Sequence, residues 1–162
     1  MIAFAPPSPL VTDYAPLSGL VRVADGVTPG GQHWHLRART GHGEFTAEIS
    51  LPTLGRAHED GGDFTSGPLP SARFMTAEQG EGFGRQKDEY VVDGVVGAGV
   101  ARLRLTTASG TLLLRPRTTP AAALRRYPAL RRIKLYVKFL DVAAEKIEAL
   151  DASGAVVATQ KL

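Results

Sequence analysis

Short segments in which apolar and polar residues alternate recur along this chain of 162 residues. The clearest spans His33–Arg39, where Trp34, Leu36 and Ala38 fall on one side and histidines and arginines fall on the other. Successive side chains of a β-strand point to opposite faces, so a period of two predicts a strand with one buried face. The pattern returns in Glu44–Leu51, after a short glycine-containing turn. This pattern favours a core built from half-buried sheets.

Further strands are predicted along the rest of the chain, many of them bounded by glycine-containing turns. They are Gly19–Ala24, Ala72–Thr76, Glu89–Val96, Val100–Thr106, Thr111–Arg117, Arg132–Leu140, Lys146–Asp151 and Ala155–Thr159. Thr119–Tyr127 is a helix candidate, and a helix over Asp141–Leu150 competes with the strand there, which we favour. Many short strands predict an all-β fold: an antiparallel β-sandwich of broadly immunoglobulin-like architecture, with a barrel as the alternative and at most one or two short helices.

The length suits one domain that buries about 70% of the unfolded chain's surface. Eight of the eleven prolines lie within residues 1–70, and residues 1–18 are predicted to form an extended proline-rich arm. Residues 19–162 would then form a single β-sandwich domain. Within it, residues 52–86 contain seven glycines, which predicts a long glycine-rich loop.

The sequence contains no cysteine, which excludes disulfides, thiolate zinc sites and cysteine nucleophiles. This absence favours a cytoplasmic location, or an extracytoplasmic one if the sequence is a truncated piece. A membrane span needs about 20 apolar residues, and the run Val95–Ala101 is far shorter, so no transmembrane segment is expected. The first residues lack the basic region of a signal peptide.

Positive charge is concentrated between Ala101 and Leu140, which hold ten basic residues and no acidic one, whereas residues 1–100 hold seven basic and twelve acidic. Because alternate residues share a strand face, seven of the ten are predicted to line one sheet face, with Tyr136 available to stack or hydrogen-bond. The candidate binding residues are Arg102, Arg104, Arg115, Arg117, Arg132, Lys134, Tyr136 and Lys138. The prediction requires Arg102, Arg115 and Lys134 to point the same way; otherwise the segment is only a compositional bias.

Histidines provide a second candidate site. His33 and His35 share one strand face about 7 Å apart, a spacing that metal sites use, and His58 follows in the sequence. The pattern resembles cupin metal motifs, which would imply a metal-dependent enzyme. The glutamate that a cupin carries after its second histidine is missing, however, and two histidines on the polar side of a half-buried strand are also typical of a solvated strand face.

Three stretches resemble uncharacterised β-rich domains of actinobacterial proteins: GGQHWHLRA (Gly30–Ala38), VVDGVVGAGVARLRL (Val91–Leu105) and IEALDASGAVVATQ (Ile147–Gln160). The resemblance covers most of residues 19–160. It implies no reaction and no catalytic residues, and such domains are often extracytoplasmic with cysteines that this chain does not have.

These observations favour a soluble, non-catalytic binding or assembly module that needs no cofactor. Its basic sheet face would bind an acidic protein surface or a second copy of the chain, with nucleic acid or anionic lipid as other possible partners. The alternatives are the cupin-like metal enzyme centred on His33 and His35 and an oligomeric structural protein.

Overall fold

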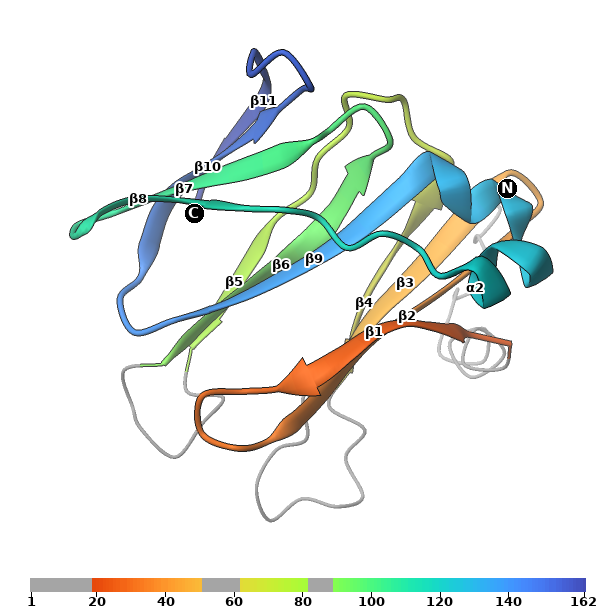
Figure 1. Ribbon diagram of the computed structural model, residues 1–162, viewed down its shortest axis with the longest axis horizontal. Helices are drawn as coiled ribbons and strands as arrows, with labels where there is room; N and C mark the ends of the chain where they lie inside the picture. Colours follow the sequence, from red (N-terminus) through yellow and green to blue (C-terminus); the bar gives the residue numbers. More distant parts are fainter. Residues whose placement is uncertain (1–18, 51–61, 82–88) are drawn as a thin grey trace, which may run out of the picture.

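The structure, a computed structural model, describes residues 19–50, 62–81 and 89–162 (Figure 1). Within them the prediction of an all-β fold is confirmed, because the elements are strands apart from one short helix and a 3-10 turn. The strands are β1 (Val21–Val27), β2 (His33–Gly41), β3 (Glu44–Ser50), β4 (Gly62–Pro68), β5 (Glu78–Glu81), β6 (Tyr90–Gly97), β7 (Arg102–Thr107), β8 (Gly110–Leu114), β9 (Ile133–Leu140), β10 (Ala144–Leu150) and β11 (Val156–Lys161). The helix is α2 (Ala121–Arg126), and the 3-10 turn η2 (Pro128–Arg132) follows it.

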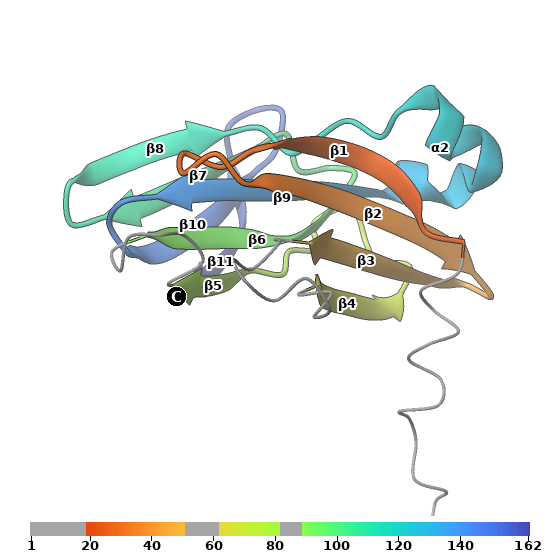
Figure 2. The ribbon, with the colours of Figure 1, turned by 90° about the horizontal axis from the view of Figure 1, so that it is seen from below.

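The strands form three antiparallel sheets. Sheet A has the order β1-β2-β3-β4, sheet B the order β5-β6-β9, and sheet C the order β11-β10-β7-β8. Sheet B lies between the other two (Figure 1). The edge strands β1, β9 and β8 lie along one side of this stack, and β4, β5 and β11 lie along the opposite side (Figure 2). The described strands form no closed barrel, and the third sheet extends the sandwich that the sequence predicts.

Sheet B is buried on both faces. Val91 and Val95 of β6 pack in the core shared with sheet A, whereas Val92 and Val96 pack in the core shared with sheet C. A strand covered on both sides is apolar at consecutive positions instead of alternating, which explains the run Tyr90–Gly97. The half-buried strands behave as predicted: on β2 the side chains of Trp34, Leu36 and Ala38 are buried and those between them are not.

The turn of the last hairpin is held by the side chain of Asp151. Its Oδ1 accepts hydrogen bonds from the backbone amide of Ser153 at 2.9 Å, from the Ser153 hydroxyl at 2.6 Å and from the amide of Ala155 at 3.0 Å. These bonds, with the Ser153 hydroxyl contributing most, hold the pKa of the Asp151 carboxyl below its ordinary value. Gly154 at φ 87° supplies the left-handed conformation that the turn requires.

The structure corrects two expectations and bears out two others. β4 and β5 lie inside residues 52–86, so the prediction of one long loop is wrong for these two segments. The strand expected at Ala72–Thr76 is reduced to a single bridge between Met75 and Val96. The strand favoured over a helix near the C-terminus is confirmed as β10, and the predicted helix at Thr119–Tyr127 as α2. The proline-rich arm lies outside the described residues.

Candidate functional site

The predicted basic face divides between two sheets. Arg102 and Arg104 belong to β7 of sheet C, and Arg115 directly follows β8 of the same sheet. The candidates on β9 belong to sheet B instead. The prediction that all of them share one sheet face is therefore wrong. The physical reason is that sheet C ends with β8 at Leu114, whereas the next strand, β9, belongs to sheet B and pairs with β6 instead of β7.

Lys134 and Tyr136 lie on the face of β9 that is turned toward sheet C, where the side chain of Lys134 is partly buried. The Lys134 ammonium donates a hydrogen bond to the Val100 carbonyl at 2.9 Å. Tyr136 is fully buried, and its hydroxyl donates to the Thr76 carbonyl at 2.5 Å. Burial, with smaller effects from Asp93 and Glu78, raises the pKa of Tyr136 far above its ordinary value. A stacking role for Tyr136 is thus excluded, and the residue is part of the core.

The remaining three candidates, Arg132, Arg117 and Lys138, lie outside sheet C. Arg132 ends η2, and its guanidinium donates to the Pro70 carbonyl at 3.1 Å. Arg117 lies over the ring of Trp34, with its guanidinium carbon 5.5 Å from the ring centroid. Lys138 is exposed near the end of β9.

Basic side chains nevertheless do gather on the outer face of sheet C. Leu103 and Leu105 of β7 and Ile147 of β10 are buried against sheet B, so the residues between them point outward. The register places Arg104 beside Glu148, and it places Lys146 beside Lys161. Arg115 follows Leu114, which pairs with the inward-facing Leu103, so alternation directs the exposed Arg115 side chain outward as well. We call these outward basic residues the cationic face: Arg102, Arg104, Arg115, Lys146 and Lys161.

Two members of the cationic face, Lys146 and Lys161, lie outside the basic segment. They were not among the candidate binding residues predicted from the sequence. The charge count over residues 141–162 is slightly acidic, which hid them. The alternation of Lys146 and Glu148 with buried Ile147 and Ala149 was the available signal. This alternation could not show that β10 lies between β7 and β11 in sheet C.

Glu148 is the carboxylate paired with the cationic face. Arg104 Nε donates a hydrogen bond to Glu148 Oε1 at 3.0 Å, and Lys146 Nζ lies 3.6 Å from the same oxygen. The hydrogen bond from Arg104 is the largest cause of a lowered pKa of the Glu148 carboxyl, and the charge of Lys146 adds to it. One carboxylate balances only one positive charge, so the face as a whole stays positive.

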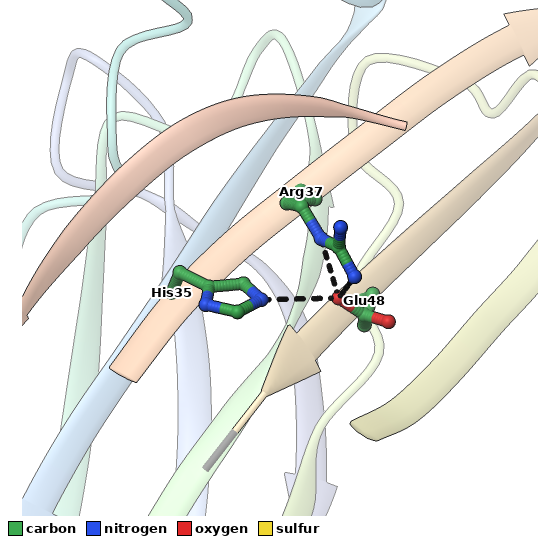
Figure 3. Close-up of polar contacts among 3 residues, drawn as sticks. All are labelled: His35, Arg37 and Glu48. Atoms are coloured by element: carbon green, nitrogen blue, oxygen red, sulfur yellow. Dashed lines mark hydrogen bonds and ion pairs between the residues drawn. The ribbon is translucent and has the colours of Figure 1, made fainter. Parts of the chain in front are cut away.

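A second polar cluster lies on the outer face of sheet A, where β2 pairs with β3 (Figure 3). Arg37 donates to Glu48 Oε1 from Nε at 2.7 Å and lies 2.6 Å from it through Nη2. His35 Nε2 lies 3.4 Å from the same oxygen. The Glu48 side chain is only 2% exposed, whereas those of His35 and Arg37 are about one-third exposed. The side chains of Arg37 and His35 therefore cover a buried carboxylate.

This cluster does not support the predicted metal site. His33 and His35 share a face of β2 as expected, but His35 points at Glu48 and not at a second histidine (Figure 3). Among the described residues, no group of three or more histidine, aspartate or glutamate side chains could hold a metal ion. His58 lies outside the described residues.

Glu48→Gln is expected to lower the free energy of unfolding by about 2 kcal/mol, because it leaves the Arg37 guanidinium without its buried counter-charge. Urea unfolding followed by circular dichroism measures the change. Glu44→Gln, at an exposed position of the same strand and face, is the matched control and should change stability by less than about 0.5 kcal/mol. Equal stability of the two variants would contradict a structural role for the Glu48 cluster.

Comparison with protein-family models, with curated proteins and with solved structures finds no significant match to this chain. The resemblance to actinobacterial β-rich domains therefore stays a prediction. No helix in the described part of the chain is long and apolar enough to cross a membrane.

Proposed function

We propose that this protein is a non-catalytic binding module whose cationic face binds an acidic surface of a partner protein. The observation that carries the proposal is the convergence of five basic side chains on one outward sheet face, with Glu148 as the carboxylate paired among them. Strands lie about 4.8 Å apart and alternate residues about 7 Å apart, so these charges act on a partner together. A surface of one sign attracts and orients a surface of the opposite sign.

The composition of the cationic face bears on the kind of partner. Its central strands carry arginine, lysine and threonine side chains, with Leu113 exposed beside Arg104. Sequence-tolerant binding of single-stranded nucleic acid relies on exposed aromatic side chains, and Tyr136 is buried elsewhere. Pairing of this face with the same face of a second copy would oppose like charges, which is unfavourable. An acidic surface of another protein needs no exposed aromatic side chains on the cationic face, and it brings opposite charges together.

The test uses polyglutamate as a synthetic acidic partner and measures its affinity over a series of salt concentrations. We expect affinity to fall as salt rises, because binding releases counterions and screening weakens the attraction. The double variant Arg102→Gln, Arg115→Gln should bind about tenfold more weakly at low salt, equivalent to about 1.4 kcal/mol. Neither side chain lies in the core, so folding should be retained.

The matched control is the double variant Arg125→Gln, Arg131→Gln. It removes the same charge from exposed positions on α2 and η2, outside sheet C. Its affinity should stay within about twofold of the parent protein. The proposal is wrong if affinity does not depend on salt, or if the control variant loses as much affinity as the variant of the cationic face.

A further inference from the structure

An open hollow lies beside β9, away from the cationic face. Its volume is about 360 Å³, and its lining includes Thr28 of the turn after β1, Trp34, Arg117, and the β9 residues Val137, Lys138 and Phe139. The rings of Trp34 and Phe139 pack together with their centroids 6.0 Å apart. The hollow therefore combines an aromatic wall with two basic side chains, and a strand forms one of its sides.

That strand is an edge strand. β9 is the last strand of sheet B and pairs with β6 on its other side. The segment after β8 touches the free edge at one point, where the Arg117 amide donates to the Leu135 carbonyl at 2.7 Å. The free edge of β9 lies on the same side of the molecule as β1 and β8, which are edge strands of sheets A and C (Figure 2).

The backbone of Val137 points to this free edge. In an antiparallel strand the N–H and C=O of a residue point to the same side, and the side alternates along the strand. Leu135 bonds to Arg117, so Val137, two residues later, presents its N–H and C=O in the same direction. Among the described residues, no backbone hydrogen bond reaches Val137 from that side. An unpaired edge of this kind is a template for another strand.

The two cations of the hollow are not neutralised by a described carboxylate. No ion pair joins Arg117 or Lys138 to any acidic side chain of the described ranges, in contrast to Arg104 with Glu148. The backbone amide of Arg117 is hydrogen-bonded to β9, and its guanidinium contacts the ring of Trp34. These two contacts fix where the positive charge of Arg117 lies.

We propose that this hollow binds an extended acidic peptide segment, which adds as a strand to the free edge of β9 and places a carboxylate between Arg117 and Lys138. The backbone of Val137 supplies hydrogen bonds that do not depend on the peptide's sequence. The two cations select a carboxylate, and the Trp34–Phe139 wall contacts a neighbouring apolar side chain. This is the strand-addition mode of peptide recognition. It is independent of the cationic face, which lies on sheet C.

Trp34 provides the assay, because it is the one tryptophan of the chain. The probe is the pentapeptide Thr-Val-Glu-Val-Thr, acetylated and amidated so that its glutamate carries its only charge. We expect a saturable change in Trp34 fluorescence on titration with this peptide. The same peptide with glutamine in place of glutamate should bind about tenfold more weakly, since it loses the charged contact. A version with N-methylated valines, which cannot pair with the edge, should bind weakly as well.

The protein variants are Lys138→Gln and Arg115→Gln. Both remove one exposed positive charge, but only Lys138 lines the hollow. Lys138→Gln should weaken binding of the glutamate peptide several-fold, and Arg115→Gln should leave it unchanged. The proposal is overturned by an absence of saturable binding, by equal binding of the N-methylated peptide, or by equal losses in the two variants. Because Arg115 belongs to the cationic face and does not line the hollow, Arg115→Gln also tests whether the peptide binds at the cationic face instead. If polyglutamate does not bind the cationic face, the peptide titration still tests the hollow.

Discussion

Gly94→Ala is expected to lower the free energy of unfolding by about 3 kcal/mol or more, because an added methyl group has no space in a packed core. A Cβ at Gly94 would collide with the backbone carbonyl of Thr76 and would lie 2.6 Å from the Tyr136 hydroxyl. Thr76 is held in place, since its amide donates to the Val95 carbonyl at 2.8 Å. The backbone cannot move aside without breaking that bond. Chemical unfolding of the purified variant measures the loss.

Gly41→Ala is the matched control. Gly41 also lies in a strand and is not among the glycines with positive φ, but a Cβ there would meet nothing within 4 Å. We expect this variant to be as stable as the parent or slightly more stable, by up to about 1 kcal/mol, because alanine restricts the unfolded chain. Similar destabilisation by both substitutions would show that strand propensity, and not the close approach at Thr76, governs Gly94.

Tyr136→Phe is expected to make stability less dependent on pH in alkaline solution. In the folded protein the raised pKa keeps the Tyr136 hydroxyl protonated, whereas in the unfolded chain it ionises near its ordinary value of 10.0. Above that pH the unfolded state binds fewer protons than the folded state, so stability falls as pH rises. The fall contributed by this group is about 1.4 kcal/mol per pH unit. Below pH 10 its contribution is constant.

The measurement compares urea unfolding of the parent protein and Tyr136→Phe at pH 8 and pH 11.5. At pH 8 the variant should be less stable by about 1 to 2 kcal/mol, because the Thr76 carbonyl loses its hydrogen bond. At pH 11.5 the difference should shrink or reverse. Tyr127→Phe is the control, since it removes a hydroxyl that donates to the Gly19 carbonyl at 2.8 Å in a part-buried contact. Parallel pH dependence in all three proteins would contradict the buried position of Tyr136.

Local sequence patterns were sufficient for most strands. The alternation in β2 and the apolar run in β6 follow directly from which faces of the strand are covered. The pattern failed at β4, whose sequence GDFTSGP has little apolar content. β4 is an edge strand that pairs with β3 through its backbone. Backbone hydrogen bonds do not require alternating apolar side chains, so the sequence of β4 shows no strand pattern. β5 was missed for the same reason.

The candidate site was harder to predict than the strands. Strand alternation correctly placed Arg102 and Arg104 on the face opposite Leu103 and Leu105. It could not show that the other face of β9, with Lys134 and Tyr136, would be covered by sheet C. A polar side chain near an interior can reach a backbone carbonyl, as Lys134 does at Val100, so its charge alone does not place it at the surface.

The sequence by itself determined that the chain is all-β, where most of its strands run, and that its positive charge is concentrated in one stretch. These properties depend on residues close together in the chain. Only the tertiary structure decided which strands become neighbours, and hence that Lys146 and Lys161 join Arg102, Arg104 and Arg115 while Arg117 and Lys138 line a separate hollow. Strand pairing joins residues far apart in sequence, as Arg104 and Glu148 are, and it depends on how whole faces pack rather than on any local pattern.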